Sequence, residues 1–294
     1  MAYFNAEEYD HAARAFTQAA TLRPGDAQAH LHLGQALGSA KKTEQAISEY
    51  RKAIELDPKD PRPYLELGKA LAKRAQYTEA VQMLRRAAAL APDDVNISLE
   101  LGAVLTLAGW YEEGLKTYQA ILTKAPKTPE IHYFLGHAYR NLGQFAESRR
   151  ELELELAQSP NHVNALRNLA LIELESGQEN RALALLEQVV TLKPEHHWAQ
   201  YDLGRLYLKR RGYPRAIEHL RRSVELNPEF SGAYYQLFLA YSRSHQAELA
   251  RQARIQYLKL AEKRIGQADQ LQAYPDRPAA EGFESDKTST MAPR

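Results

Sequence analysis

Apolar and polar positions follow a helical period along the chain, most clearly in the 34-residue stretch 61–94, PRPYLELGKALAKRAQYTEAVQMLRRAAALAPDD. In its first part Leu67, Gly68 and Leu71 fall on one face of a helix, and in its second part Ala80 and Leu84 share a face in the same way. The proline near its end cannot continue a helix and biases its predecessor away from the α region. The stretch therefore predicts two helices joined by a short turn and closed by a proline.

The same arrangement returns every 34 residues, and proline makes up only about 5% of residues in ordinary proteins, so chance does not explain the coincidence. The closing prolines are Pro24, Pro58, Pro92, Pro126, Pro160, Pro194 and Pro228. The leucines of the first helices are Leu33, Leu67, Leu101, Leu135, Leu169, Leu203 and Leu237. The chain is thus a repeat array that grows along one dimension.

Small residues mark where the two helices of each unit approach most closely, because only Gly, Ala or Ser leaves room for both backbones. Some units depart from this rule. Gly114 and Ser148 stand where alanine is usual in the second helix, Glu155 replaces a further alanine, and Glu173 stands where a large apolar residue is expected. These departures predict locally looser packing or a slight rotation of the helices, and not a different fold.

The repeat register divides the chain into four parts. Residues 1–26 form an incomplete first repeat, mainly its second helix, with Ala12, Phe16 and Ala19 in register and residue 1 already inside the first helix. We expect the natural chain to extend upstream; the alternative is that residues 1–22 form an irregular cap. Residues 27–230 contain six complete repeats.

The eighth repeat, residues 231–271, is divergent. Phe238 replaces the glycine, Arg254 replaces the large apolar residue, and no proline stops the second helix, which we expect to continue to about Leu271 and cap the array. Residues 272–294 have the Pro, Ser and charged composition of a disordered tail. A linker to a downstream domain is the alternative for that segment.

Composition sets limits on partners and compartment. The 294 residues are 44% hydrophobic and 26% charged with a formal net charge of +1, which argues against bulk attraction to nucleic acid or anionic lipid. The absence of cysteine excludes disulfides, thiolate metal sites and cysteine nucleophiles. No apolar run reaches the roughly 20 residues of a membrane span, and the N-terminus lacks a signal-peptide layout. We expect a cytoplasmic protein, or a periplasmic one if the true start lies upstream.

The spacing of leucine–glycine, tyrosine, alanine and proline resembles the tetratricopeptide repeat family, over about residues 1–262. The resemblance implies an all-α, right-handed α-solenoid of stacked antiparallel helix pairs. It also implies that the first helices line a concave groove and that the second helices lie outside. Members of this family usually bind peptides or partner proteins there and are not themselves enzymes, so we expect an interaction scaffold or adaptor, bacterial in style, without catalysis.

No catalytic or metal-binding pattern stands out. His132 and His137 are five residues apart, which is not the i, i+4 spacing of helical zinc sites, and there is no phosphate loop or nucleophile motif. Glu151, Glu153 and Glu155 alternate with leucine on one helix, which we interpret as a solvated outer face paired locally with the preceding arginines. We therefore expect no catalytic residues, no cofactor and no metal.

Family geometry places the second, fifth, ninth, twelfth and thirteenth positions of each first helix on the concave side. In the front half these positions form a leucine ladder with some cations, made up of Gln28, Leu31, Gln35, Arg62, Leu65, Lys69, Lys73, Asn96, Leu99 and Ala103. In the back half they combine rings and cations, and acidic residues are nearly absent apart from Glu130 and Glu175. The predicted partner-binding residues are Tyr133, His137, Arg140, Asn164, Arg167, Trp198, Tyr201, Arg205, Lys209, Tyr235 and Arg243.

This back half favours an extended, acidic peptide, because Arg and Asn bind carboxylates and main chain while Trp and Tyr supply flat apolar area. The competing interpretation is that these side chains simply face solvent, with the rings stacking between repeats. Two family subtypes are not matched: the two-carboxylate clamp shares only Asn168, and the asparagine ladder is absent.

Three other functions stay open. The array could be the regulatory or substrate-recruiting part of a larger enzyme. The basic and aromatic groove could bind single-stranded RNA by stacking and phosphate contacts, although nucleic acid is not the expected partner. The incomplete first repeat could also stack on a second copy of the chain.

Overall fold

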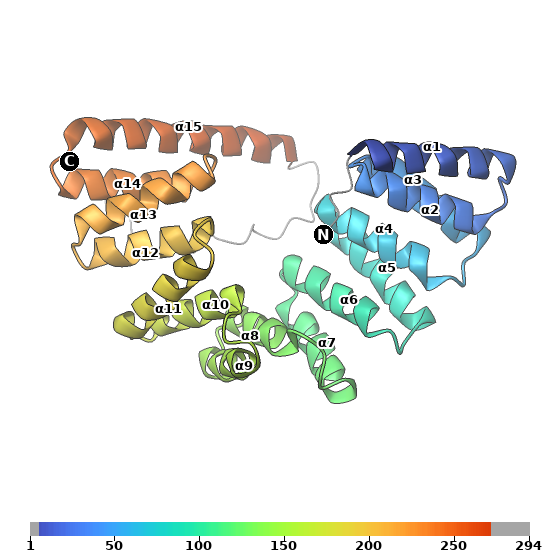
Figure 1. Cartoon of the computed structure of the whole chain (residues 1–294), viewed down its shortest axis with the longest axis horizontal. Helices are drawn as coiled ribbons and strands as arrows, with labels where there is room; N and C mark the ends of the chain where they lie inside the picture. The colour runs from blue at the N-terminus through green and yellow to red at the C-terminus, as the bar shows by residue number, and fades with distance from the viewer. Residues whose placement is uncertain (1–5, 272–294) are drawn as a thin grey trace. The chain divides into compact units, whose positions relative to one another are not determined.

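The computed structural model describes residues 6–271, and side chains for residues 11–263. Over these residues the chain is all-helical, an α-solenoid of consecutive antiparallel helix pairs, as the periodicity predicts (Figure 1). The predictions for the first five residues and for the tail 272–294 lie outside the described part. No helix within residues 6–271 is both long enough and apolar enough to cross a membrane.

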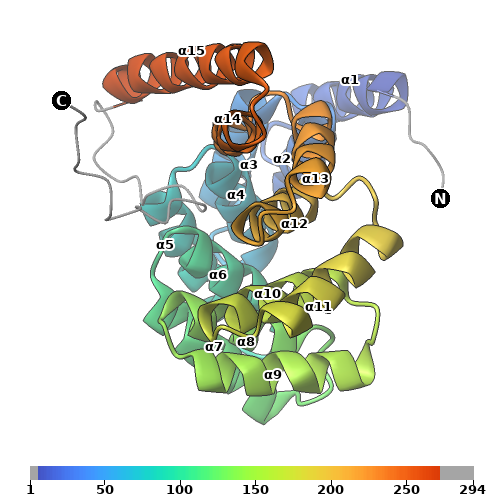
Figure 2. The same ribbon diagram turned by 90° about the vertical axis from the view of Figure 1, so that its left-hand side faces the viewer.

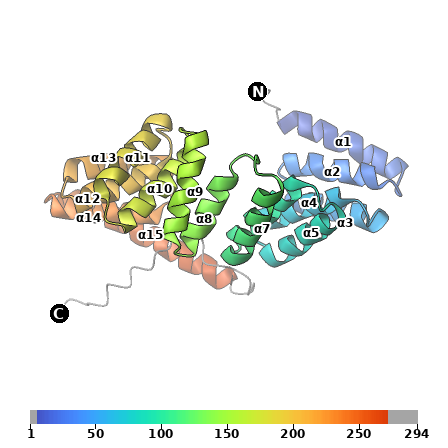
Figure 3. The ribbon, with the colours of Figure 1, turned by 90° about the horizontal axis from the view of Figure 1, so that it is seen from below.

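The chain divides into two compact units, one ending at Thr128 and the other beginning at Pro129. Figure 3 shows the helices of the first unit, with α1 packed beside α2. The first unit contains α1 (Ala6–Leu22), α2 (Ala27–Ser39), α3 (Thr43–Leu56), α4 (Pro61–Lys73), α5 (Tyr77–Leu90), α6 (Val95–Leu107) and α7 (Tyr111–Lys124).

In the second unit, α10 packs against both α9 and α11, and α14 against α15 (Figure 2). First helices of neighbouring pairs also touch, α8 with α10 and α12 with α14. The unit contains α8 (Ile131–Asn141), α9 (Phe145–Gln158), α10 (Val163–Glu175), α11 (Glu179–Leu192), α12 (His197–Lys209), α13 (Tyr213–Leu226), α14 (Ser231–Arg243) and α15 (Ala247–Leu271).

The predicted scaffold residues form the core of each pair. Leu67 and Leu71 are 1% exposed, and Ala80 and Leu84 are fully buried. A Cβ on Gly68 would lie 2.7 Å from Cγ of Leu84, so a side chain at this position would push the two helices apart. The glycine is therefore required by the close approach of the helices, as the repeat pattern indicates.

Helix starts differ between the two units. In the first unit Asp26, Asp60 and Asp94 each accept a hydrogen bond from the backbone N–H two residues further on, at 2.9–3.0 Å. In the second unit Nδ1 of His162 and His196 accepts the N–H three residues further on, at 3.1 and 3.2 Å. A carboxylate caps a helix over a wide pH range, whereas an imidazole accepts such a bond only when that nitrogen carries no proton.

The turn inside each pair needs a backbone conformation that the helical pattern did not reveal. One residue per turn adopts a positive φ of 58–79°, where glycine avoids the clash that a Cβ creates. Three of the seven turns use glycine and four do not. The residues are Lys41, Ala75, Gly109, Gly143, Gly177, Arg211 and His245.

Two polar residues that depart from the repeat pattern, Ser148 and Glu173, are fully buried, so the expectation of looser packing is wrong for them. Ser148 donates a 2.6 Å hydrogen bond to the carbonyl of Gly136. Glu173, whose side chain is 1% exposed, pairs with Arg149 at 3.2 Å and with Arg181 at 3.1 Å. The hydroxyl and the carboxylate therefore take specific partners where an apolar side chain would otherwise fill space.

The α9 carboxylates do not have the local partners that the sequence suggests, and only Glu153, whose side chain is 47% exposed, is solvated as expected. Glu151 pairs with His132 of α8 at 2.7 Å, and Glu153 pairs with Arg181 of α11 at 2.8 Å. Glu155 is 3% exposed and accepts the backbone N–H of Tyr133 at 3.3 Å. All three carboxylates thus connect α9 to other helices.

The division between the units coincides with an irregular helix start. The 34-residue register runs through this point without interruption, but α8 begins only at Ile131 and has 11 residues where the other first helices have 13. Its N-cap, Glu130, has a left-handed φ of 60° and makes no side-chain cap. The sequence pattern therefore did not predict where the chain divides.

Candidate functional site

The eleven predicted partner-binding residues all lie on first helices of the second unit: α8, α10, α12 and α14. The front-half positions lie on α2, α4 and α6 of the first unit. The two halves of the predicted groove therefore belong to different units. The second-unit set is built from four consecutive helix pairs and forms the candidate site.

Arg167 of α10 is held in place by two neighbours on α12. Its Nε donates a 2.7 Å hydrogen bond to Asp202, whose side chain is 3% exposed, and its guanidinium lies 5.4 Å from the ring centroid of Trp198. The Arg167 side chain is 21% exposed. Among the described residues, its terminal nitrogens have no hydrogen-bond partner. They are therefore available to an acceptor that approaches from solvent.

An aromatic cluster lies at the N-terminal ends of α12 and α14, and we define it as His197, Trp198, Tyr201 and Phe230. The ring of Phe230 has its centroid 4.5 Å from that of Trp198 and 4.7 Å from that of Tyr201, and His197 meets it edge-on at 5.9 Å. All four side chains are only partly buried. Such arrangements supply apolar area with a fixed geometry.

Positions on helix faces do not include Phe230, because Phe230 is the N-cap of α14. A signal was present in the sequence. Phe230 occupies the repeat position at which Asp26, Asp60 and Asp94 cap the helices of the first unit. An aromatic residue at a capping position cannot cap the helix, so its presence there called for another explanation.

At the other end of the site, α8 contributes a second ring contact. Tyr133 lies 4.8 Å from the ring of His162, centroid to centroid. The His137 ring lies within hydrogen-bonding distance of the Asn141 side chain, with 3.3 Å between Nε2 of His137 and Nδ2 of Asn141. Burial, with the charges of Arg140 and Arg167 nearby, lowers the pKa of His137 to about 4. His137 is thus neutral at physiological pH and contributes no charge there.

The remaining predicted residues differ in their exposure to solvent and in their contacts with neighbouring rings. Arg205 is exposed, and its guanidinium lies 5.5 Å from the ring centroid of Tyr201. Asn164 and Arg243 are exposed as well. Tyr235 is 39% exposed and packs against the ring of Tyr257 of α15 at 5.3 Å. The structure therefore brings Arg205 to the aromatic cluster and places Arg243 near the C-terminal end of α14.

The face is less basic than the sequence suggested. Two carboxylates absent from the predicted set neutralise part of its charge: Asp202 pairs with Arg167, and Glu179 pairs with Lys209 at 2.7 Å. Lys209 pairs through its one nitrogen, Nζ, and is a weak candidate for contact with an acidic partner, whereas Arg167 pairs through Nε and keeps its terminal nitrogens. Arg205 and Arg243 have no ion pair with any residue in the described part of the chain.

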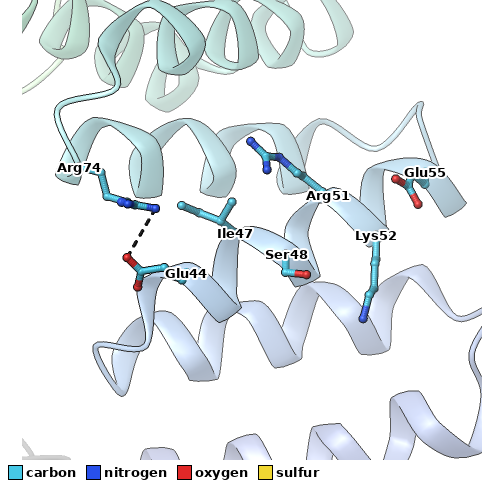
Figure 4. Close-up of a pocket in the computed structure, with 7 residues that line it drawn as sticks. All are labelled: Glu44, Ile47, Ser48, Arg51, Lys52, Glu55 and Arg74. Carbon is cyan, nitrogen blue, oxygen red and sulfur yellow. Dashed lines mark ion pairs between the residues drawn. The ribbon is translucent and has the colours of Figure 1, made fainter. Parts of the chain in front are cut away.

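The first unit offers a surface pocket of about 460 Å³, lined by residues of α3 and by Arg74 at the end of α4 (Figure 4). Its three cations are already paired with carboxylates. Arg74 pairs with Glu44 at 3.5 Å. Arg51 pairs with Glu79 at 2.6 Å, and Lys52 pairs with Glu49 at 3.0 Å. The pocket thus lacks an available charge to hold an anion. Within the described residues no group of histidines and carboxylates is arranged to hold a metal ion.

This architecture, in which variable side chains on the first helices are carried by a recurring scaffold of helix pairs, defines a helical-repeat protein. The chain matches family models described as TPR repeat over residues 39–75 and as tetratricopeptide repeat over residues 65–129, 133–197 and 173–237. Together these matches span most of the described residues. The chain belongs to the tetratricopeptide repeat family.

Solved structures agree with this assignment. YrrB, described as a TPR protein with an unusual peptide-binding site, is 25% identical over 64% of this chain and 97% of its own, with a TM-score of 0.53. A tetratricopeptide repeat protein from Parabacteroides merdae shares the fold at 15% identity over 80% of this chain and 93% of its own, with a TM-score of 0.69. The Cut9–Hcn1 complex of the APC/C gives 15% identity, a TM-score of 0.68, and coverage of 91% of this chain and 53% of its own.

A search of curated proteins found no match. The repeat family and its structural relatives support a protein–protein interaction scaffold in general, and the repeat is typically non-catalytic.

Proposed function

We propose that the first-helix face of the second unit binds an extended, acidic segment of a partner protein. The observation that carries the proposal is the state of Arg167. Its Nε is fixed by Asp202 and its flat face by Trp198, so the terminal nitrogens are presented without further loss of side-chain freedom. A guanidinium held in this way suits the bidentate recognition of a carboxylate.

Further groups on the same face would contact other parts of an extended peptide. Arg205 and Arg243 supply two more guanidiniums, and Asn164 supplies an exposed amide that can bond to a main chain. Partly exposed rings between the cations offer area for the apolar parts of the ligand. An extended segment lying across α8 to α14 would reach all of these groups.

The test is binding of a fluorescent acidic peptide to the full chain and to the variant Arg140→Ala, Arg167→Ala, Arg205→Ala. Loss of one charge-assisted hydrogen bond costs about 1.5–3 kcal/mol, so we expect affinity to fall by at least tenfold. Arg221→Ala, Arg222→Ala on the outer helix α13 is the matched control and should bind as the unchanged chain does. A glutamine-substituted peptide should bind weakly to all three proteins.

Unweakened binding by the triple variant would exclude this site. An oligonucleotide control separates the second candidate ligand. If single-stranded RNA binds with a steep salt dependence while acidic peptides fail to bind, the face is a nucleic-acid site and the proposal is wrong.

A further inference from the structure

The chain carries, outside its described residues, a segment whose chemistry matches the candidate site. Residues 281–286 read EGFESD, so Phe283 is flanked by Glu281, Glu284 and Asp286. Tyr274 is the only other aromatic residue of the stretch 272–294, and a single carboxylate, Asp276, lies near it. An aromatic side chain among carboxylates is the ligand that an aromatic cluster flanked by guanidiniums would select.

We propose that residues 281–286 bind to the aromatic cluster of their own chain and compete there with the partner's acidic segment. Phe283 would pack against Trp198 and Phe230, and its neighbouring carboxylates would pair with Arg167 and Arg205. This inference rests on the proposed function, because it assigns the same face to a specific acidic ligand.

The position of α15 makes the intramolecular contact possible. Lys263 of α15 pairs with Glu229 at 2.5 Å, and Glu229 is the residue directly before Phe230 of the cluster. Tyr257 of α15 also touches Tyr235 of α14. The final helix therefore passes beside the aromatic cluster within the second unit.

The length of the chain is sufficient for the segment to return. From Lys263 the helix continues for eight residues to Leu271, a rise of about 12 Å. The twelve residues from Leu271 to Phe283 span at most about 40 Å when extended. Phe283 can thus reach back over the last turns of α15 to the cluster with slack to spare.

Charge and tethering both favour the contact. The segment 281–286 carries three carboxylates and no cation, while Arg167 and Arg205 are the guanidiniums that lie over rings of the cluster. Twelve residues separate Leu271 from Phe283, and a tether this short sets an effective concentration of about millimolar. Even a weak site would consequently be occupied by its own tail.

Fluorescence of Trp198 reports on the contact directly. The chain has two tryptophans, and Trp110 is the N-cap of α7 in the first unit, with 36% of its surface exposed. In the full-length variant Trp110→Phe, Trp198 is therefore the sole indole. We expect Phe283→Ala in this background to shift its emission to longer wavelength and to raise its quenching by acrylamide at least twofold.

Two comparisons make that result specific. Met291→Ala changes an apolar residue of the same stretch that has no carboxylate beside it, and it should leave Trp198 unchanged. Adding the synthetic peptide EGFESD to the Phe283→Ala variant should restore shielding, whereas EGAESD should not. Equal quenching of the Phe283→Ala and unchanged chains would overturn the proposal, and a shielding that disappears on dilution would place the segment on a second copy instead.

Affinity for an external acidic peptide separates this proposal from the proposed function. If the tail competes, Phe283→Ala should bind that peptide several-fold more tightly than the unchanged chain. Peptide binding that is equal in the two proteins, with no response of Trp198, rejects the tail contact and leaves the proposed function standing. A response of Trp198 to Phe283→Ala that EGFESD reverses, with no binding of other acidic peptides, supports the tail contact and rejects the proposed function.

Discussion

The two units share one scaffold and differ in the residues attached to it. Leu84 in the first unit and Leu220 in the second are both fully buried against the glycine of their partner helix. The fifth position of the first helices, by contrast, is leucine at residues 31, 65 and 99 and becomes tyrosine or arginine at residues 133, 167, 201 and 235. The repeat therefore fixes how the helices pack and leaves the fifth position of the first helices free to change.

Charge on the outer helices reverses between the units. In the first unit an arginine pairs with a glutamate 28 residues later, as in Arg51 with Glu79 at 2.6 Å and Arg85 with Glu113. In the second unit the order is inverted, and Glu153 pairs with Arg181 at 2.8 Å. The same geometric contact thus accepts either polarity, and the helix backbone does not dictate the sign.

Titration behaviour also separates the units. Every histidine whose pKa is clearly lowered lies in the second unit, and burial is the largest cause each time; these residues are His137, His196, His197 and His219. The charge of Arg167 adds to the effect at the first three. The second unit therefore favours uncharged imidazoles, at the His196 helix cap and near the candidate site.

The largest expected effect tests whether the scaffold really is the same in both units. Leu84→Ala and Leu220→Ala remove equivalent buried side chains, and each should reduce the stability of its own unit by about 2–5 kcal/mol. Hydrogen exchange followed by mass spectrometry measures this loss helix by helix and does not require two-state unfolding. If the losses of stability caused by the two substitutions differ by more than the experimental error, the two units are not packed alike.

An intermediate effect is expected from acid. The pKa of His137 is lowered from 6.5 to about 4, so the unfolded chain binds the proton more readily than the folded unit. The stability that the second unit gains at neutral pH from keeping His137 uncharged is fully present above pH 6.5 and is lost as the pH falls toward 4. Between pH 7 and pH 5 the second unit should lose about 2 kcal/mol through this residue alone.

Hydrogen exchange at pH 7 and pH 5, corrected for the intrinsic rate, checks this difference. Protection should decrease in α8, α10 and α12 and remain in α4 and α6, whose starts are capped by aspartate. The variant His137→Asn cannot titrate and should show a smaller decrease. Equal losses in both units would mean that the lowered histidine pKa values do not set the acid sensitivity.

The sequence predicted the scaffold because its cause is local and periodic. Leu67, Gly68 and Pro92 recur at 34 residues, and each has one physical task that only a few residue types can perform. The candidate site was predicted less fully. Asp202 holds Arg167 from the next helix pair, a contact that helix-face positions within one repeat cannot reveal.

The periodic pattern could not predict two further features of the structure, for different reasons. Phe230 belongs to a connection between helices, where no face rule applies. The late start of α8 depends on the left-handed backbone of Glu130, and the sequence register on either side of it is unbroken. Non-local pairs and loop conformations therefore set the limit of what the repeat could indicate.

The smallest expected effect concerns the inverted charge pairs on the outer helices. In the first unit Arg85 and Glu113 are about half exposed, so their pairing should contribute no more than about 1 kcal/mol. Either Arg85→Glu or Glu113→Arg alone should destabilise the unit slightly, and the double exchange should restore it, because the contact accepts either polarity. A double-mutant cycle in urea or hydrogen exchange gives the coupling energy.

The corresponding exchange in the second unit should not be neutral. Arg181 pairs with Glu153 and also with Glu173, whose side chain is 1% exposed. In Glu153→Arg, Arg181→Glu the new glutamate would face the buried carboxylate of Glu173, and two like charges would meet away from water. We therefore expect the double exchange to cost more in the second unit than in the first. Equal recovery in both units would show that Arg149 alone satisfies Glu173, because that arginine would be its only remaining partner among the described residues.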